Sequence, residues 1–192
     1  MSFHWLHERP IVVAIAGSKG AGKSTFYGAF IRLAGLPCVN PDVLARTLEL
    51  EPYVAARIAG VIRRELVNEG VSFAFETVFS DPVGDKLQFL KATAAAGYTV
   101  VLCYIGLASA ALSRQRVAMR VSQGGHGVPA DKLKARYPRS LANLKWALNE
   151  LPHVLVYDNS DLAHPMHHVA AFDGGQLTFA APALPKWLAQ LI

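Results

Sequence analysis

A glycine-rich run near the N-terminus has the spacing of a phosphate-binding loop. Residues 17–24 read GSKGAGKS and match G-x-x-x-x-G-K-[ST], between an apolar run at 11–16 and a predicted helix start. Glycines in such loops let backbone N–H groups face phosphate oxygens at the positive end of the following helix. Lys23 is expected to reach the β and γ phosphates, and the Ser24 hydroxyl to hold Mg²⁺. We therefore expect ATP and Mg²⁺ as ligands, bound through Gly17, Ser18, Lys19, Gly20, Ala21, Gly22, Lys23, Ser24 and Thr25. For Lys19 two interpretations stay open, a charge near the γ-phosphate and a solvated loop lysine.

Two acidic residues follow predicted strands at the edge where the phosphates would lie. Asp42 follows a short strand at 37–40, and Glu76 ends a strand at 72–76. Ligands of open parallel sheets bind at the carboxyl ends of the strands. Phosphoryl transfer needs an acid that takes the proton of the acceptor hydroxyl, assigned here to Asp42, and another that holds the metal, assigned to Glu76. The alternatives are a helix N-cap for Asp42 and a bond to Thr77 or to backbone for Glu76.

The excess of positive charge is concentrated in one stretch. The chain has 19 lysines and arginines against 14 acidic residues, and residues 114–139 hold seven of the basic residues and one acidic residue. A local phosphate site explains this distribution better than a generally basic surface. Arginines that move over a transferring phosphate neutralise its charge and exclude water.

The arginines of this stretch form two pairs with helical spacing. Arg116 and Arg120 are four residues apart, and Arg136 and Arg139 are three apart, so each pair can share a helix face. Between the pairs lies GGHGVP, residues 124–129, with glycines that can act as a hinge. We predict a lid over about 114–140 in which Arg116 contacts the nucleotide and Arg120, Arg136 and Arg139 are catalytic. The alternative is two solvated basic helices, and His126 in the hinge is open to a substrate contact or a structural role.

The order of the predicted elements places these residues at one edge of a sheet. Strands at 11–16, 37–40, 72–76, 98–105 and 153–158 alternate with helices, among them 23–33, 52–68 and 131–150. This alternation favours an α/β fold with a parallel sheet and helices on both faces. The uncharged run from Ala92 to Ser113 is long enough to span a membrane, but Gly97 and Gly106 divide it. It is therefore interpreted as a helix end, a central strand over 98–105 that is buried on both faces, and a new helix start.

Composition limits the class of protein. The chain has 192 residues, of which 52% are hydrophobic and 17% charged, which excludes a disordered chain and fits a single domain over 1–192. Cys38 and Cys103 lie in apolar runs and are interpreted as reduced core thiols of a cytoplasmic protein. After about residue 160 the pattern changes to a hairpin with a turn at 173–175 and a closing helix over 182–192. This extension is expected to cover an edge of the sheet or to help seat the nucleotide base.

Five segments together resemble the short zeta-toxin-like P-loop kinases. They are GSKGAGKST, VNPDVLA, FAFETVFS, the run from Arg116 to Leu144, and VLVYDNS, within about residues 11–160. The resemblance implies a nucleoside-kinase-like P-loop NTPase fold with a five-stranded parallel sheet in the order 2-3-1-4-5. It also implies Asp42 as the base that activates the hydroxyl, and lid arginines on the phosphates. Zeta toxins phosphorylate UDP-N-acetylglucosamine and are silenced by a small antitoxin, so a nucleotide-sugar acceptor and an antitoxin partner are further expectations. The chain carries Lys19 where its short relatives often carry Asn.

The predicted function is therefore transfer of the γ-phosphate of ATP to a hydroxyl of a small metabolite. A nucleic-acid 5′-hydroxyl kinase would use the same parts, but only Tyr137 and Trp146 accompany the basic residues as aromatic platforms, so nucleic acid is the weaker expectation. A non-enzymatic ATP-binding switch is a third alternative, and it would need neither an acceptor-activating Asp nor an arginine lid.

Overall fold

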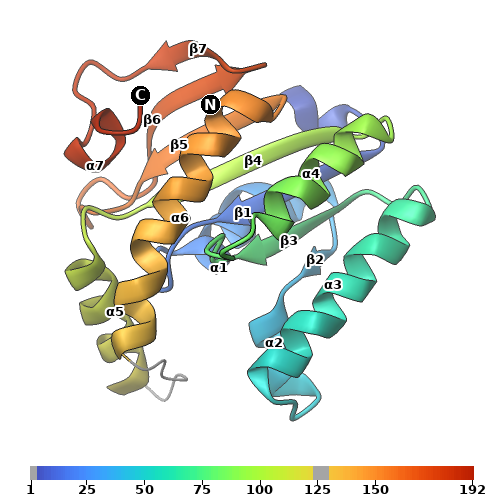
Figure 1. Ribbon diagram of the computed structural model, residues 1–192, viewed down its shortest axis with the longest axis horizontal. Helices are drawn as coiled ribbons and strands as arrows, with labels where there is room; N and C mark the ends of the chain where they lie inside the picture. Colours follow the sequence, from blue (N-terminus) through green and yellow to red (C-terminus); the bar gives the residue numbers. More distant parts are fainter. Residues whose placement is uncertain (1–3, 123–129) are drawn as a thin grey trace.

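The computed structural model describes residues 4–122 and 130–192 and shows a single mixed sheet with helices on both faces (Figure 1). The sheet order is β2-β3-β1-β4-β5-β6-β7. The first five strands pair in parallel, in the predicted order. Their bounds are β1 (Ile11–Ala16), β2 (Cys38–Val39), β3 (Phe73–Thr77), β4 (Thr99–Gly106) and β5 (His153–Asp158).

The prediction of a five-stranded sheet is wrong in the number of strands, because the C-terminal hairpin joins the sheet. Strands β6 (His167–Asp173) and β7 (Gln176–Ala180) form the expected hairpin, whose turn contains Gly174 and Gly175. Strand β6 pairs antiparallel with β5 and thereby satisfies backbone groups that an edge strand would leave open. The hairpin therefore extends the sheet to seven strands and covers the edge of β5.

Alternating side chains of β1 supply two separate cores, one on each face of the sheet. Val12, Ala14 and Ala16 pack into the core that contains residues of α3 (Pro52–Asn68), α4 (Asp85–Ala95) and α6 (Ala130–Glu150). The intervening Ile11, Val13 and Ile15 pack into the core on the other face, with Phe26 and Trp5. All six β1 residues are buried, as a strand covered on both faces requires.

The helix after the phosphate loop is less regular than the sequence predicts. In place of one helix over 23–33, α1 (Lys23–Phe26) continues as a π-helix over Tyr27–Ile31 and a 3₁₀ turn over Arg32–Ala34. A short helix, α2 (Pro41–Thr47), follows β2, where the sequence suggested a helix only through the N-cap alternative for Asp42. Its N-cap is Asn40, whose side-chain oxygen accepts hydrogen bonds from the backbone N–H groups of Asp42 and Val43. Asp42 therefore lies within the first turn and is not the cap.

Helix α6 is bound to the loops that follow β3 and β4. The Tyr137 hydroxyl donates to the Leu107 carbonyl at 2.7 Å, and the Ser140 hydroxyl donates to the Val78 carbonyl at 2.8 Å. The buried Asn143 amide donates to the carbonyls of Phe79 and Asp81. Helix α6 is thus fixed at its centre to these two loops. The helix before it is α5 (Ala110–Ser122), and the segment GGHGVP with His126, predicted as a hinge, lies outside the described residues.

The closing helix is shorter than expected but is held firmly against the sheet. It spans α7 (Lys186–Ala189), where a helix over 182–192 was predicted. The Trp187 indole N–H donates to Asp158 at 3.1 Å, and its ring lies against Gly106, where an added Cβ would lie 2.1 Å from Cζ2. Within residues 4–122 and 130–192, no helix has the length and apolarity needed to cross a membrane.

Candidate active site

A cleft of about 340 Å³ opens at the carboxyl ends of β1 and β3, where the phosphate loop, α2 and α5 meet. The elements that line it are far apart in sequence and are brought together by the parallel sheet. Its lining residues are Lys19, Gly20, Gly22, Lys23, Ser24, Thr25, Asn40, Pro41, Asp42, Glu76, Thr77, Val78, Arg116 and Arg120. Most of the residues predicted from the sequence therefore line one cavity.

The phosphate loop is pressed against the ends of the neighbouring strands, and glycine is required at two of its positions. A Cβ on Gly17 would lie 2.2 Å from the Ile105 carbonyl oxygen, and the φ of Gly17 is 137°. A Cβ on Gly22, whose φ is 95°, would lie 2.8 Å from Asn159 Nδ2 and from Met166 Cε. Glycine at these two positions therefore allows the loop to adopt its turn in close contact with the protein behind it.

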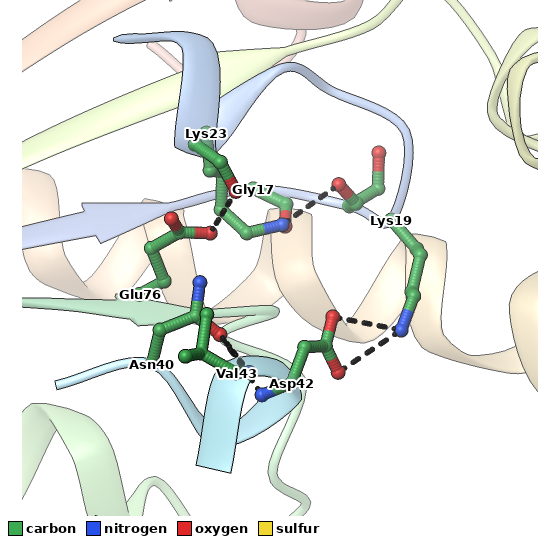
Figure 2. Close-up of polar contacts among 9 residues, drawn as sticks. Gly17, Lys19, Lys23, Asn40, Asp42, Val43 and Glu76 are labelled. Atoms are coloured by element: carbon green, nitrogen blue, oxygen red, sulfur yellow. Dashed lines mark hydrogen bonds and ion pairs between the residues drawn. The ribbon is translucent and has the colours of Figure 1, made fainter. Parts of the chain in front are cut away.

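Lys23 is held over this loop by backbone carbonyls. Its Nζ donates to the Gly17 carbonyl at 2.9 Å and to the Ser18 carbonyl at 3.2 Å (Figure 2). Burial lowers the pKa of Lys23 to about 8, and the charges of Glu76 and Asp42 oppose part of that effect. The ammonium lies ready for an anionic ligand, because phosphate oxygens can replace the two carbonyl contacts.

This lowered pKa predicts that nucleotide binding is linked to proton uptake. Above about pH 8 the free protein holds Lys23 mostly neutral, whereas bound phosphates favour the ammonium, so affinity for ATP should fall as the pH rises through this value. Calorimetry at about pH 8.5 in two buffers of different ionisation enthalpy would measure the protons taken up. Lys23→Met should abolish that component of proton uptake, and an unchanged uptake in Lys23→Met would contradict the assignment.

Ser24 and Glu76 form the oxygen pair that fits a divalent cation. The Ser24 hydroxyl donates to Glu76 Oε2 at 3.0 Å, and the Glu76 side chain is buried at the end of β3. Hydroxyl and carboxylate oxygens are the ligands that Mg²⁺ accepts in nucleotide sites. Within the part of the chain that the structure describes, the Glu76 side chain bonds to the phosphate-loop serine and to neither Thr77 nor backbone, so the alternative interpretation of Glu76 is not observed.

Asp42 faces the loop from the opposite side and is ion-paired to Lys19. Lys19 Nζ lies 2.9 Å from Asp42 Oδ2 and 3.1 Å from Oδ1, and Figure 2 shows the two side chains extended toward one another. Burial raises the pKa of the Asp42 carboxyl, but the hydrogen bond from Lys19 and the charges of Lys19, Lys23 and Arg120 more than offset it. The pKa lies below its usual value, so Asp42 is a carboxylate at neutral pH.

The four predicted arginines divide into two sets. Arg116 and Arg120 of α5 line the cleft, and Arg116 Nη2 donates to the Ser160 carbonyl at 3.2 Å. Burial lowers the pKa of Arg116, opposed by the charge of Asp158. Arg136 and Arg139 of α6 are not among the cleft residues. Their catalytic role stays a prediction.

The predicted site residues and the residues that line the cleft differ in both directions. Some cleft residues were not predicted from the sequence, and some predicted residues do not line the cleft. Asn40 is the clearest omission, and its signal was the order Asn-Pro-Asp, which places a capping side chain before a proline suited to the first helical position. Ser18 and Ala21 are buried in the loop and do not line the cleft, so only their backbone remains a candidate for phosphate contacts.

Comparison with known protein families shows to which family the chain belongs. The family model described as Zeta toxin matches residues 52–166, more than half of the chain. The chain belongs to the zeta toxin family. The match begins after the phosphate loop and after Asp42, so the loop geometry and the family match are independent observations. No curated protein matches the chain.

Solved structures share the fold of this zeta toxin family member at low identity. A complex of AvrRxo1-ORF1 and AvrRxo1-ORF2 with sulphate ions has a TM-score of 0.68 at 17% identity over 96% of this chain and 63% of that chain. The same complex with ATP has a TM-score of 0.68 at 17% identity, over 90% of this chain and 61% of that chain. A structure from the PezAT toxin–antitoxin system of Streptococcus pneumoniae has a TM-score of 0.64 at 13% identity, over 94% of this chain and 76% of that chain. The chain thus spans less than two thirds of the first two structures, and all three likenesses establish the fold.

Proposed function

We propose that the chain is an ATP-dependent phosphotransferase that transfers the γ-phosphoryl group to a hydroxyl of a small molecule. The observation that carries the proposal is the arrangement of the cleft. A phosphate loop with Lys23, an oxygen pair at Ser24 and Glu76, and the Asp42 carboxylate all face the same cavity. A protein that only binds ATP needs the first two of these, and phosphoryl transfer to an alcohol needs all three.

Each side chain has a role that follows from its position. Asp42 accepts the proton of the acceptor hydroxyl while the acceptor oxygen bonds to the γ-phosphorus. The bond from that phosphorus to the β–γ bridging oxygen breaks, and its electron pair leaves with ADP. Lys23 and Arg120 offset the charge of the phosphates from two sides. Mg²⁺ held at Ser24 and Glu76 would neutralise charge on the β and γ oxygens.

Among acceptors, we propose a nucleotide sugar such as UDP-N-acetylglucosamine. Membership of the zeta toxin family supports this choice, as does a cleft with Arg116 and Arg120 on one wall, which suits an acceptor that carries phosphates. The aromatic residues that would favour a nucleic acid are not in the cleft, and Tyr137 uses its hydroxyl to bind Leu107. An antitoxin partner belongs to the same proposal, and the toxin–antitoxin neighbour from Streptococcus pneumoniae supports it.

The direct test of the acceptor is a panel of nucleotide sugars and a 5′-hydroxyl oligonucleotide, incubated with ATP and Mg²⁺ and analysed by mass spectrometry. We expect a phosphorylated nucleotide sugar and an unchanged oligonucleotide. Phosphorylation of the oligonucleotide alone would replace the small-molecule assignment with a nucleic-acid kinase.

The division of the arginines predicts unequal effects on turnover. Arg120→Ala is expected to lower turnover by about 10²-fold or more with a smaller effect on nucleotide affinity, because charge spreads over the transferred group only as it moves. Arg114→Ala is the matched control, since Arg114 is exposed on the same helix and does not line the cleft. Steady-state kinetics would measure turnover of the two variants. Equal turnover in both would show that α5 is a solvated basic helix.

A further inference from the structure

The ion pair between Lys19 and Asp42 joins the phosphate loop to the proposed base and has no role in the mechanism described above. The Lys19 side chain is 14% exposed and the Asp42 side chain 62%, so the cation is the more buried partner. The backbone carbonyl of Lys19 accepts a hydrogen bond at 2.7 Å from the buried Ser113 hydroxyl of α5. Lys19 is thus fixed at its backbone by α5 and at its ammonium by α2.

Phosphoryl transfer brings two groups of like charge close together at this point. The acceptor hydroxyl must touch both the base and the γ-phosphorus, so the Asp42 carboxylate and the γ-phosphate are separated by little more than one oxygen atom. Two like charges at so short a separation repel one another. A cation placed between them would offset this repulsion.

We propose that the Lys19 ammonium bridges the Asp42 carboxylate and the γ-phosphate of bound ATP, so that Lys19 is a positioning residue for the base. The inference rests on the proposed function. Lys19 has the required geometry, because it belongs to the loop that holds the phosphates and its Nζ already lies within hydrogen-bond distance of both oxygens of Asp42.

Other cations near Asp42 are less suited to this bridge. Lys23 and Arg120 also face Asp42 and contribute to its low pKa. The Nζ of Lys23, however, bonds to the carbonyls of Gly17 and Ser18. Arg120 is exposed on α5, and neither residue forms an ion pair with Asp42 within the part of the chain that the structure describes.

A double-mutant cycle on nucleotide binding tests the bridge without any phosphoryl transfer. The variants are Lys19→Met, Asp42→Asn and the double variant, with Lys19→Arg as the conservative rescue and the exposed Lys145→Met as a control for loss of charge. The probes are the non-hydrolysable analogue adenylyl imidodiphosphate, which has a γ-phosphoryl group, and ADP, which has none. Dissociation constants are measured by calorimetry in the presence of Mg²⁺.

The bridge predicts a specific pattern of coupling. Lys19→Met should weaken binding of the analogue by about tenfold, and ADP binding much less. Asp42→Asn alone should change the affinity for the analogue less than about twofold. In the Lys19→Met background it should raise that affinity several-fold, because there the unscreened carboxylate repels the γ-phosphate. Lys19→Arg and Lys145→Met should bind as the unchanged protein does.

Two results would overturn the bridge. Equal weakening of the analogue and of ADP by Lys19→Met would show that the lysine only supports the loop. The same effect of Asp42→Asn in both backgrounds would show that Lys19 does not couple the base to the γ-phosphate. Because the cycle measures binding alone, a missing acceptor or absent turnover would count against the proposed function and leave the result of the cycle unaffected.

Discussion

Asp42→Asn is expected to bind ATP about as well as the unchanged protein and to transfer the γ-phosphoryl group about 10² to 10⁴ times more slowly. An amide keeps the shape of the side chain but cannot accept the proton of the acceptor hydroxyl. Loss of a helix cap cannot account for such a result, since Asn40 and not Asp42 caps α2. Nucleotide affinity and transfer should be measured on the same preparation.

The matched control for this variant is Asp85→Asn. Asp85 is also an exposed acid in the first turn of a helix, but it does not line the cleft. Its transfer rate should be unchanged. Transfer near normal in Asp42→Asn would instead make Glu76, the buried carboxylate beside Ser24, the better candidate for the base.

Lys23→Ala is expected to abolish productive use of ATP and to leave the fold intact. The Lys23 ammonium bonds only to the carbonyls of Gly17 and Ser18 among the hydrogen bonds of the described chain, and its side chain belongs to neither core. Removing it leaves the phosphates without their buried cation, while the two carbonyls can bind water. Turnover should fall to background, with a thermal unfolding midpoint close to that of the unchanged protein.

Lys145→Ala, at an exposed position on α6, is the control for this second variant and should retain full turnover. Unchanged turnover in Lys23→Ala would remove the assignment of residues 17–24 as the phosphate loop. A large fall in the unfolding midpoint would show that Lys23 has a structural role that the two carbonyl contacts do not reveal.

The parts of the fold that could be predicted are those that residues close together in the sequence determine. Strand β1 is a run of six apolar residues followed by glycine, a pattern that favours a short strand buried on both faces. The phosphate loop was predicted for the same reason, since its glycines and Lys23 are needed within eight residues of one another. Long-range pairing is different. Nothing in the hairpin's own sequence shows that β6 would pair with β5 and raise the strand number to seven.

The candidate site also has a part that could be predicted from the sequence and a part that could not. Asp42 and Glu76 could be placed at the cleft because Asp42 follows β2 and Glu76 lies near the end of β3, and the carboxyl ends of these strands share one edge. The ion pair of Asp42 with Lys19 joins residues from two elements, and sequence spacing does not encode the approach of α2 to the loop. Arg136 and Arg139 have the spacing of a shared helix face, yet spacing does not say whether that face meets the cleft.

The measurement that tests the central claim most directly follows the γ-phosphate of ATP itself. The protein is incubated with Mg²⁺ and ATP whose γ-phosphoryl oxygens carry ¹⁸O, together with a fractionated metabolite extract, and products are analysed by mass spectrometry. The account predicts a small molecule that gains one phosphoryl group bearing the label, and predicts its absence with Lys23→Ala and its strong reduction with Asp42→Asn. Label found only in inorganic phosphate, or a labelled product formed equally by both variants, would contradict the assignment of this cleft as a kinase active site.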